Sequence, residues 1–215
     1  MKWLIASDIH GSEYYCKQLL ETYDREKAER LLLLGDILYH GPRNDLPRDY
    51  NPKRVIELLN ARKQDIICVR GNCDTEVDQM VLEFPILADY CVVADGNKLI
   101  YATHGHNYNE KHLPPLHKGD ILLHGHTHVP KCVEHEDYIY MNPGSVSIPK
   151  EESWKGYMIF ENDSFVWKDL QGEEQMHYPE RKLEKRGRYN EGGCDGKDVY
   201  GIAEKAREHV RKIKE

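Results

Sequence analysis

Hydrophobic runs that end in glycine and polar residues recur along the chain and predict a sheet-rich α/β fold. The clearest run is Leu31 to Leu34, where four consecutive leucines are followed directly by Gly35 and Asp36. An apolar run with neither helical nor alternating period is typical of a strand that is buried on both faces. We therefore predict a buried strand here, with Asp36 at its carboxyl end. Shorter runs predict further strands at residues 2–6, 65–69, 98–103 and 120–123.

Helical spacing separates the first strands. Apolar residues recur at three- and four-residue steps between Glu13 and Arg25, which predicts an amphipathic helix, and Asn51-Pro52 is a favourable start for a second one. The first two strands and the helix between them then form a βαβ unit whose strand ends share one edge. We also predict a short helix at 76–83 and hairpins at 90–94 with 98–103, 132–135 with 138–142, and 157–160 with 165–167.

The last part of the chain has a different pattern. Residues 171–197 are charged, contain glycine and lack an apolar period, which predicts a linker or a poorly ordered segment. Apolar residues from Val199 to Ile213 then recur at helical spacing. We expect one domain over 1–170, followed over 171–215 by a charged linker and a C-terminal amphipathic helix. This helix is expected to pack on its own domain or on a second copy, because its thin apolar face lacks the aromatics of membrane-binding helices.

Composition argues against a nucleic-acid-binding, secreted or membrane-spanning protein. The chain has 215 residues and a net charge of -7, which argues against a broad nucleic-acid-binding face because phosphate contacts need clustered Lys and Arg. The apolar start runs straight into Asp8, so it predicts neither a signal peptide nor a membrane span. Six cysteines are scattered without a Cys-x-x-Cys pair, and a mean hydropathy of -0.74 fits a cytoplasmic protein with free thiols.

Residues of metal-ligand type follow most of the predicted strands. A lone His or Asp at a strand end is usually a loop residue or a cap, but here the pattern repeats at five places, mostly beside glycine. We therefore predict a metal site made of Asp8, His10, Asp36, Asn72, His104, His126 and His128. Seven oxygen and nitrogen donors are too many for one tetrahedral zinc, so two cations that share a carboxylate fit better.

These motifs carry a family resemblance. Asp8-Ile9-His10, Gly35-Asp36, Gly71-Asn72-Cys73-Asp74, His104 and Gly125-His126-Thr127-His128 stand in the order found in calcineurin-like metallophosphoesterases. The stretches His40-Gly41-Pro42-Arg43-Asn44 and Asn142 to Lys150 resemble the YfcE-type bacterial phosphodiesterases within that superfamily. The resemblance covers Met1 to about Leu170 and leaves the segment after Gln171 uncovered.

The resemblance implies a four-layer αββα sandwich, in which two mixed sheets are flanked by helices. It implies that Asp8, His10 and His128 hold one ion, that Asn72, His104 and His126 hold the other, and that Asp36 bridges them. His106 is expected behind the ligands or facing substrate, and His124 is expected to face away. Substrate contacts are implied for His40, Arg43 and Asn44, although a solvated loop is the ordinary alternative for such residues.

One position departs from the common pattern of the superfamily. Many of its members have His after the Gly-Asn pair, where it protonates the leaving oxygen, whereas this chain has Cys73, as YfcE-type members do. Because a thiol is a poor substitute for that His, we expect substrates with acidic leaving groups, with His106 as an assisting residue. The implied catalytic residues are Asp36, Asn72, Cys73 and His106.

The resulting hypothesis is an enzyme, a metal-dependent phosphodiesterase that cleaves small phosphodiesters through a hydroxide bridging two cations. Manganese is the expected metal, with Ni, Co, Fe or Zn as alternatives. A small phosphoester is the expected partner, without nucleic acid or membrane, and the resemblance suggests a homo-oligomer. The alternatives are a non-catalytic scaffold on the same fold, a single-metal binding protein and, among enzymes, a phosphomonoesterase or a nuclease, of which the acidic net charge disfavours the nuclease.

Overall fold

The computed structural model of the chain describes residues 1–179, which contain two β-sheets and three α-helices. The strands and helices follow one another in the order β1 (Trp3–Ala6), α1 (Glu13–Glu26), β2 (Arg30–Leu33), α2 (Pro52–Asn60), β3 (Ile66–Cys68), α3 (Glu76–Gln79), β4 (Tyr90–Asp95), β5 (Lys98–Thr103), β6 (Asp120–His124), β7 (Lys131–Glu134), β8 (Tyr138–Asn142), β9 (Gly156–Glu161), β10 (Ser164–Asp169) and β11 (Glu174–Tyr178).

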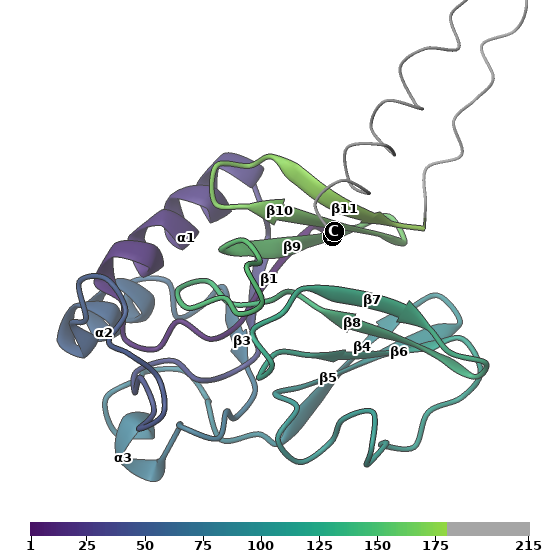
Figure 1. The fold of residues 1–215 in the computed structure, drawn as a ribbon, viewed down its shortest axis with the longest axis horizontal. Helices are drawn as coiled ribbons and strands as arrows, with labels where there is room; N and C mark the ends of the chain where they lie inside the picture. The colour runs from purple at the N-terminus through teal and green to yellow at the C-terminus, as the bar shows by residue number, and fades with distance from the viewer. Residues whose placement is uncertain (180–215) are drawn as a thin grey trace, which may run out of the picture. The chain divides into compact units, whose positions relative to one another are not determined.

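Both sheets are mixed (Figure 1). The six-stranded sheet has the order β11-β10-β9-β1-β2-β3, in which β1, β2 and β3 are parallel and β9, β10 and β11 are antiparallel to their neighbours. The five-stranded sheet has the order β4-β5-β6-β8-β7, in which β5, β6 and β8 are parallel. The expected fold class of two mixed sheets is therefore confirmed.

Two apolar cores hold the layers together. The first lies between the helices and one face of the six-stranded sheet, where Leu19 of α1 and Val55 of α2 pack with Leu4 and Leu33. The second lies between the two sheets and contains Ile5, Leu32, Leu123, Met141 and Trp167, among others. Since β1 and β2 alternate side chains between these two cores, both of their faces are buried. This explains why their sequences are apolar without a period.

The helices of the described part cover only one outer face. The outer face of the five-stranded sheet carries a small cluster of Leu122, Tyr138 and Tyr140, against which Leu116 of the 105–119 connection packs. In residues 1–179 this connection therefore takes the place of the fourth, helical layer that we expected.

The last described strand changes the expected domain boundary. β11 pairs with β10 along its length, and Met176 and Tyr178 pack against the core between the sheets. The segment from Glu174 to Tyr178 thus belongs to the six-stranded sheet, not to a linker that begins at residue 171. The expected C-terminal helix from Val199 to Ile213 lies outside the described residues.

Candidate metal centre

Several site residues stand in a backbone conformation that non-glycine residues seldom adopt. The φ angles are +61° at Asp8, +50° at His10, +55° at Asp36, +65° at His126 and +62° at His128. This left-handed conformation turns the chain sharply after the strand ends. Each such residue costs on the order of 1 kcal/mol, so a fold that keeps five of them gains something else from their geometry.

Close backbone contacts fix the loops relative to one another. A Cβ at Gly71 would lie 2.2 Å from the backbone nitrogen of Asp36, and a Cβ at Gly125 would lie 1.9 Å from Ser7 Oγ. Glycine is therefore required at both places. Behind Asp8, the hydroxyls of Ser145 and Ser147 donate to its carbonyl oxygen at 2.9 and 3.0 Å.

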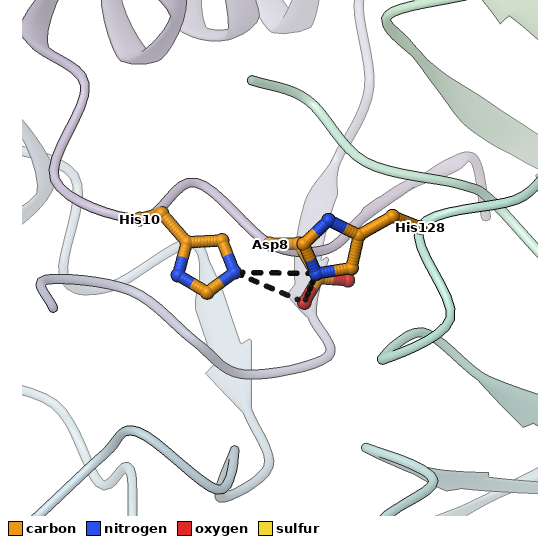
Figure 2. Close-up of side chains that lie close together, drawn as sticks. All are labelled: Asp8, His10 and His128. Atoms are coloured by element: carbon orange, nitrogen blue, oxygen red, sulfur yellow. Dashed lines mark hydrogen bonds and ion pairs between the residues drawn. The ribbon is translucent and has the colours of Figure 1, made fainter. Parts of the chain in front are cut away.

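Asp8, His10 and His128 form the first group of donors (Figure 2). The Nε2 atoms of His10 and His128 lie 3.5 and 3.3 Å from Asp8 Oδ1 and 3.3 Å from each other. Asp8 Oδ1 is buried without a hydrogen-bond partner among the described residues. Three donor atoms thus surround one point in the protein interior.

The ring orientations show which nitrogens face that point. His10 Nδ1 lies 2.7 Å from the carbonyl oxygen of Tyr39, and His128 Nδ1 lies 2.7 Å from that of Ile148. A carbonyl can only accept, so each Nδ1 carries a proton. Each Nε2 therefore offers a lone pair unless the ring takes up a second proton, which is the usual arrangement of metal-binding histidines.

A second group lies around His104. Its Nδ1 donates to the carbonyl oxygen of Leu34 at 2.6 Å, and its Nε2 lies 3.0 Å from Asn72 Oδ1 and 3.2 Å from His126 Nδ1. When the His104 ring is neutral, its Nε2 and Asn72 Oδ1 are both acceptors, so a proton or a cation must lie between them. An oxygen and two imidazole nitrogens fit a divalent transition metal.

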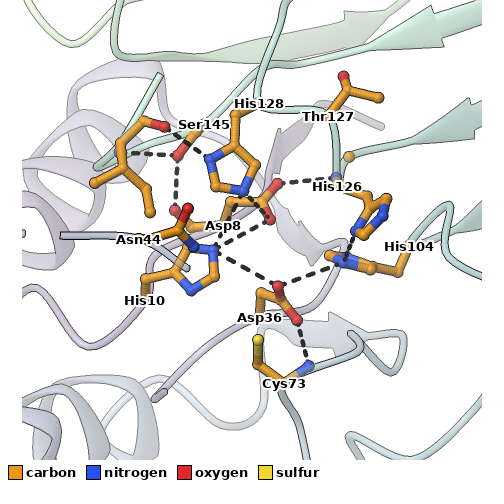
Figure 3. A network of polar contacts seen from close by, with 12 residues as sticks. Asp8, His10, Asp36, Asn44, Cys73, His104, His126, Thr127, His128 and Ser145 are labelled. Carbon is orange, nitrogen blue, oxygen red and sulfur yellow. Dashed lines mark hydrogen bonds and ion pairs between the residues drawn. The ribbon is translucent and has the colours of Figure 1, made fainter. Parts of the chain in front are cut away.

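Asp36 lies between the two groups (Figure 3). Its Oδ2 is 3.6 Å from His10 Nε2 and 3.5 Å from His104 Nε2. Its other oxygen, Oδ1, accepts the backbone N–H of Cys73 at 2.8 Å, which fixes the plane of the carboxylate. Donor atoms of Asp8, Asp36 and His104 lie within 4.8 Å of one another, as do those of His10, Asp36 and Cys73. The seven expected ligands therefore meet at one place, and the Cys73 thiol is an additional donor within reach.

The charges of the group favour cations. Burial opposes ionisation of Asp8 and Asp36, but the neighbouring histidines outweigh it and lower the pKa of both carboxyls. Burial likewise disfavours a charged His104, but Asp36 and Asp8 raise its pKa to about 9. Burial and the adjacent His104 lower the pKa of His126 to about 4. Two buried carboxylates thus favour positive charge nearby. Protonated histidines supply this charge in the absence of metal, and a bound metal ion can supply it instead.

A cavity of about 420 Å³ opens beside these ligands. The cavity is lined by the 41–44 segment and by Asp36, Asn72, Cys73, His126, Thr127, His128 and Lys150. Arg43 and Asn44, for which substrate contacts are expected, line this cavity, and Asn44 Nδ2 donates to the carbonyl oxygen of His40 at 2.8 Å. The His40 ring itself packs edge-on against Tyr39 and Tyr50 and is not among the residues that line the cavity.

The two remaining histidines are also placed. The His106 ring lies 5.4 Å from the His104 ring, outside the cavity lining, and burial followed by the charge of His104 lowers its pKa. His124 is buried against Tyr140 with ring centroids 4.5 Å apart, which agrees with the expectation that it faces away from the site.

Comparison with known proteins identifies the family. Residues 1–164 match the calcineurin-like phosphoesterase superfamily domain. The chain belongs to this superfamily. It is 45% identical to phosphodiesterase YfcE of Escherichia coli K12 over 163 residues, which cover 76% of this chain and 89% of that protein. The structure of E. coli YfcE, described as a phosphoesterase, superposes with a TM-score of 0.80 and 42% identity, and the match covers 82% of this chain and 98% of that one.

A more distant structural match concerns the fold only. The structure of Vps29 from Chaetomium thermophilum superposes with a TM-score of 0.53 and 18% identity, covering 81% of this chain and 94% of that one, so the likeness extends to the fold alone. Membership of the phosphoesterase superfamily agrees with the expected enzyme class, a metal-dependent phosphodiesterase. None of the helices in the described part has the length and apolar character that crossing a bilayer requires.

Proposed function

We propose that the chain is a phosphodiesterase that holds two divalent cations and hydrolyses small phosphodiesters. The observation that carries this proposal is the position of Asp36 Oδ2, which lies 3.6 and 3.5 Å from one histidine nitrogen of each donor group. A carboxylate oxygen in that position can be shared by two cations. The 45% identity to a named phosphodiesterase supports the choice of diesters as substrates.

The ligand roles follow from the two groups. One cation would be held by Asp8, His10 and His128, and the other by Asn72, His104 and His126. Both cations would be held by Asp36. Cations bound in this way lower the pKa of water toward about 7 and neutralise charge on phosphoryl oxygens. Manganese is the first candidate, with Ni, Co, Fe or Zn as alternatives, because the donors are oxygen and imidazole nitrogen.

The other residues of the site position the substrate. Arg43 lines the cavity, where its guanidinium can pair with an anionic group of the substrate, and Asn44 fixes the loop through its hydrogen bond to the His40 carbonyl oxygen. A thiol is a poor replacement for the histidine that protonates the leaving oxygen in many members of the superfamily, because two adjacent cations favour the thiolate. We therefore assign Cys73 a position beside the leaving oxygen and His106 a supporting position behind His104, and infer that diesters with acidic leaving groups react fastest. His40 supports the loop.

The test is to reload metal-free protein with Mn, Ni, Co, Zn or Mg and to assay a panel of phosphomonoesters and phosphodiesters. We expect at least one metal to give diesterase activity. Asp36→Asn should lower kcat by more than about 100-fold, because even residues behind metal ligands typically cost 10- to 100-fold. Asp137→Asn, in the exposed turn between β7 and β8, is the matched control. Tight binding of metal without turnover of any ester would favour the scaffold alternative.

A further inference from the structure

The cavity beside the ligands holds two cationic side chains that the metal centre does not use. Arg43 comes from the 41–44 segment and Lys150 from the segment after Ser147, and both line the cavity of about 420 Å³. Both residues are exposed. Neither side chain makes an ion pair or a hydrogen bond with any of residues 1–179. The sequence pattern gave no role to Lys150.

The backbone holds Lys150 next to the ligands. Its N–H donates to the carbonyl oxygen of His128 at 3.1 Å, and its own carbonyl accepts the Ser153 hydroxyl at 2.6 Å. In the other segment, a Cβ at Gly41 would lie 3.4 Å from Cys73 Sγ, so the segment that carries Arg43 packs against a residue that lines the cavity. Both cationic side chains therefore border the same cavity, and each comes from a segment whose backbone contacts a residue of the site.

The charge around the cavity is unusual for this protein. The whole chain has a net charge of -7, yet Asp36 is the only carboxylate among the cavity-lining residues of the described part. Asp36 is already engaged with His10, His104 and the Cys73 N–H. A phosphodiester carries one negative charge on its phosphoryl group, and the metal centre would neutralise that charge. The unpaired side chains of Arg43 and Lys150 can therefore bind a further anionic group on the substrate.

We propose that Arg43 and Lys150 form an anion subsite for the ester substituent that stays on phosphorus. Resting on the proposed function, this inference defines the substrate class as small phosphodiesters whose substituent carries a second negative charge, a carboxylate or a phosphate. Pairing across a water-exposed cavity mouth is modest in energy. The preference should therefore be visible as about a 5- to 10-fold change in KM, with little change in kcat.

The test uses p-nitrophenyl phosphodiesters with one leaving group and four second substituents: 2-carboxyethyl, 2-phosphoethyl, propyl and choline. On the metal-loaded protein we expect kcat/KM to fall from the two anionic esters through the propyl ester to the choline ester. Lys150→Ala should raise KM about 5-fold for the anionic esters and leave the propyl ester unchanged. Lys150→Glu should invert the order in favour of choline. The two anionic esters distinguish a carboxylate subsite from a phosphate subsite.

Lys118→Ala is the matched control, because Lys118 is exposed and does not line the cavity. Equal KM values for all four esters in the wild-type protein would overturn the inference while leaving the proposed function intact. An equal loss on all four esters in Lys150→Ala would do the same, since it would indicate a structural role. Absence of turnover of every diester by wild-type protein with any metal would overturn the proposed function, and the subsite with it.

Discussion

Hydrogen bonds between a side chain and the backbone hold the loops of the site in place. Asp74 is the clearest case: it is buried, and it accepts the backbone N–H groups of Asp36 and Gly71 on Oδ2 at 2.8 and 2.7 Å and that of Ile37 on Oδ1 at 2.9 Å. These bonds satisfy the donors of the tight turn that carries Asp36. Asp74 is therefore a positioning residue for the carboxylate shared by the two donor groups.

Asp74→Asn should weaken this turn, because an amide NH₂ must face at least one of the three backbone donors. We expect a loss of about 2–3 kcal/mol in the free energy of unfolding, the usual range when a hydrogen bond to a charged group is removed. Metal affinity should fall with it. Urea unfolding and metal titration check the two effects.

Asp78→Asn is the control, because Asp78 accepts the N–H of Thr75 in the exposed capping box of α3 and does not contact Asp36. An Asp74→Asn variant that binds metal as tightly as the wild-type protein would contradict the positioning role.

Among single residues, the sequence indicated the candidate metal ligands better than the residues that position them or line the cavity. Asp8, Asp36 and His128 could be predicted because residues of metal-ligand type recur after five buried runs, although one such residue alone is usually a loop residue or a cap. The role of Asp74 and the place of Lys150 could not, because each depends on contacts between segments that are far apart in the chain. The ring of His40 is turned toward Tyr39 and Tyr50, which no spacing along the sequence encodes.

A polar cluster around Glu26 connects helix α1 to strands β9 and β10 of the six-stranded sheet. Glu26, the last residue of α1, accepts Lys168 Nζ of β10 at 2.7 Å, Tyr157 OH of β9 at 2.9 Å and Lys2 Nζ at 3.2 Å. Its side chain is only 10% exposed. Burial opposes its ionisation, but Lys168, Tyr157 and Lys2 lower its pKa from 4.5.

This lowered pKa predicts a pH-dependent contribution to stability. Because the folded pKa lies below the unfolded value, the contribution is fully present above about pH 4.5 and is lost as the pH falls through the folded pKa. Glu26→Gln should cost about 1–2 kcal/mol at pH 7. The difference between variant and wild type should shrink as the pH is lowered below 4.5, as measured by urea unfolding at pH 7, 5 and 3.5.

The control is Glu57→Gln, which breaks an exposed pair with Arg54 within α2 and should change stability little at any of these pH values. A Glu26→Gln deficit that stays constant from pH 7 to pH 3.5 would contradict the electrostatic account.

The elements themselves were largely predictable. Strand β5 has the predicted bounds, and α1 extends one residue beyond the predicted end, because buried runs and helical spacing are strong signals. Strand β11 was missed for a physical reason. It is an edge strand whose first residues, Glu174 and Gln175, are exposed, and only Met176 and Tyr178 reach the core, so its sequence lacks the alternation expected of a half-buried strand.

At the scale of the whole molecule, the candidate centre joins the two sheets. Asp8, His10, Asp36 and Asn72 follow strands of the six-stranded sheet, whereas His104, His126 and His128 follow strands of the five-stranded sheet. Each donor group combines ligands from both. In metal-free protein the same edge holds two buried carboxylates and several acceptors that face one another, so a bound cation should cross-link the sheets and relieve this repulsion.

Metal removal should therefore lower thermal stability. A ligand at about 100 times its Kd stabilises the folded state by about 2.7 kcal/mol, and in a protein of this size each kcal/mol shifts Tm by about 2–4 °C. We expect Tm to rise by about 5–10 °C when metal-free protein receives saturating Mn or Zn, and to fall again with chelator. Differential scanning calorimetry across a metal titration measures this shift.

A pair of histidine variants makes the measurement specific. His128→Ala removes a ligand from the centre and should lose most of the metal-dependent shift. His135→Ala removes a histidine that stacks on Tyr138 and pairs with Glu110, away from the ligands, and should keep the shift although its basal Tm falls. If His128→Ala retained the full shift, the cations would be binding elsewhere, and the connection between the two sheets would have to come from the apolar core between them alone.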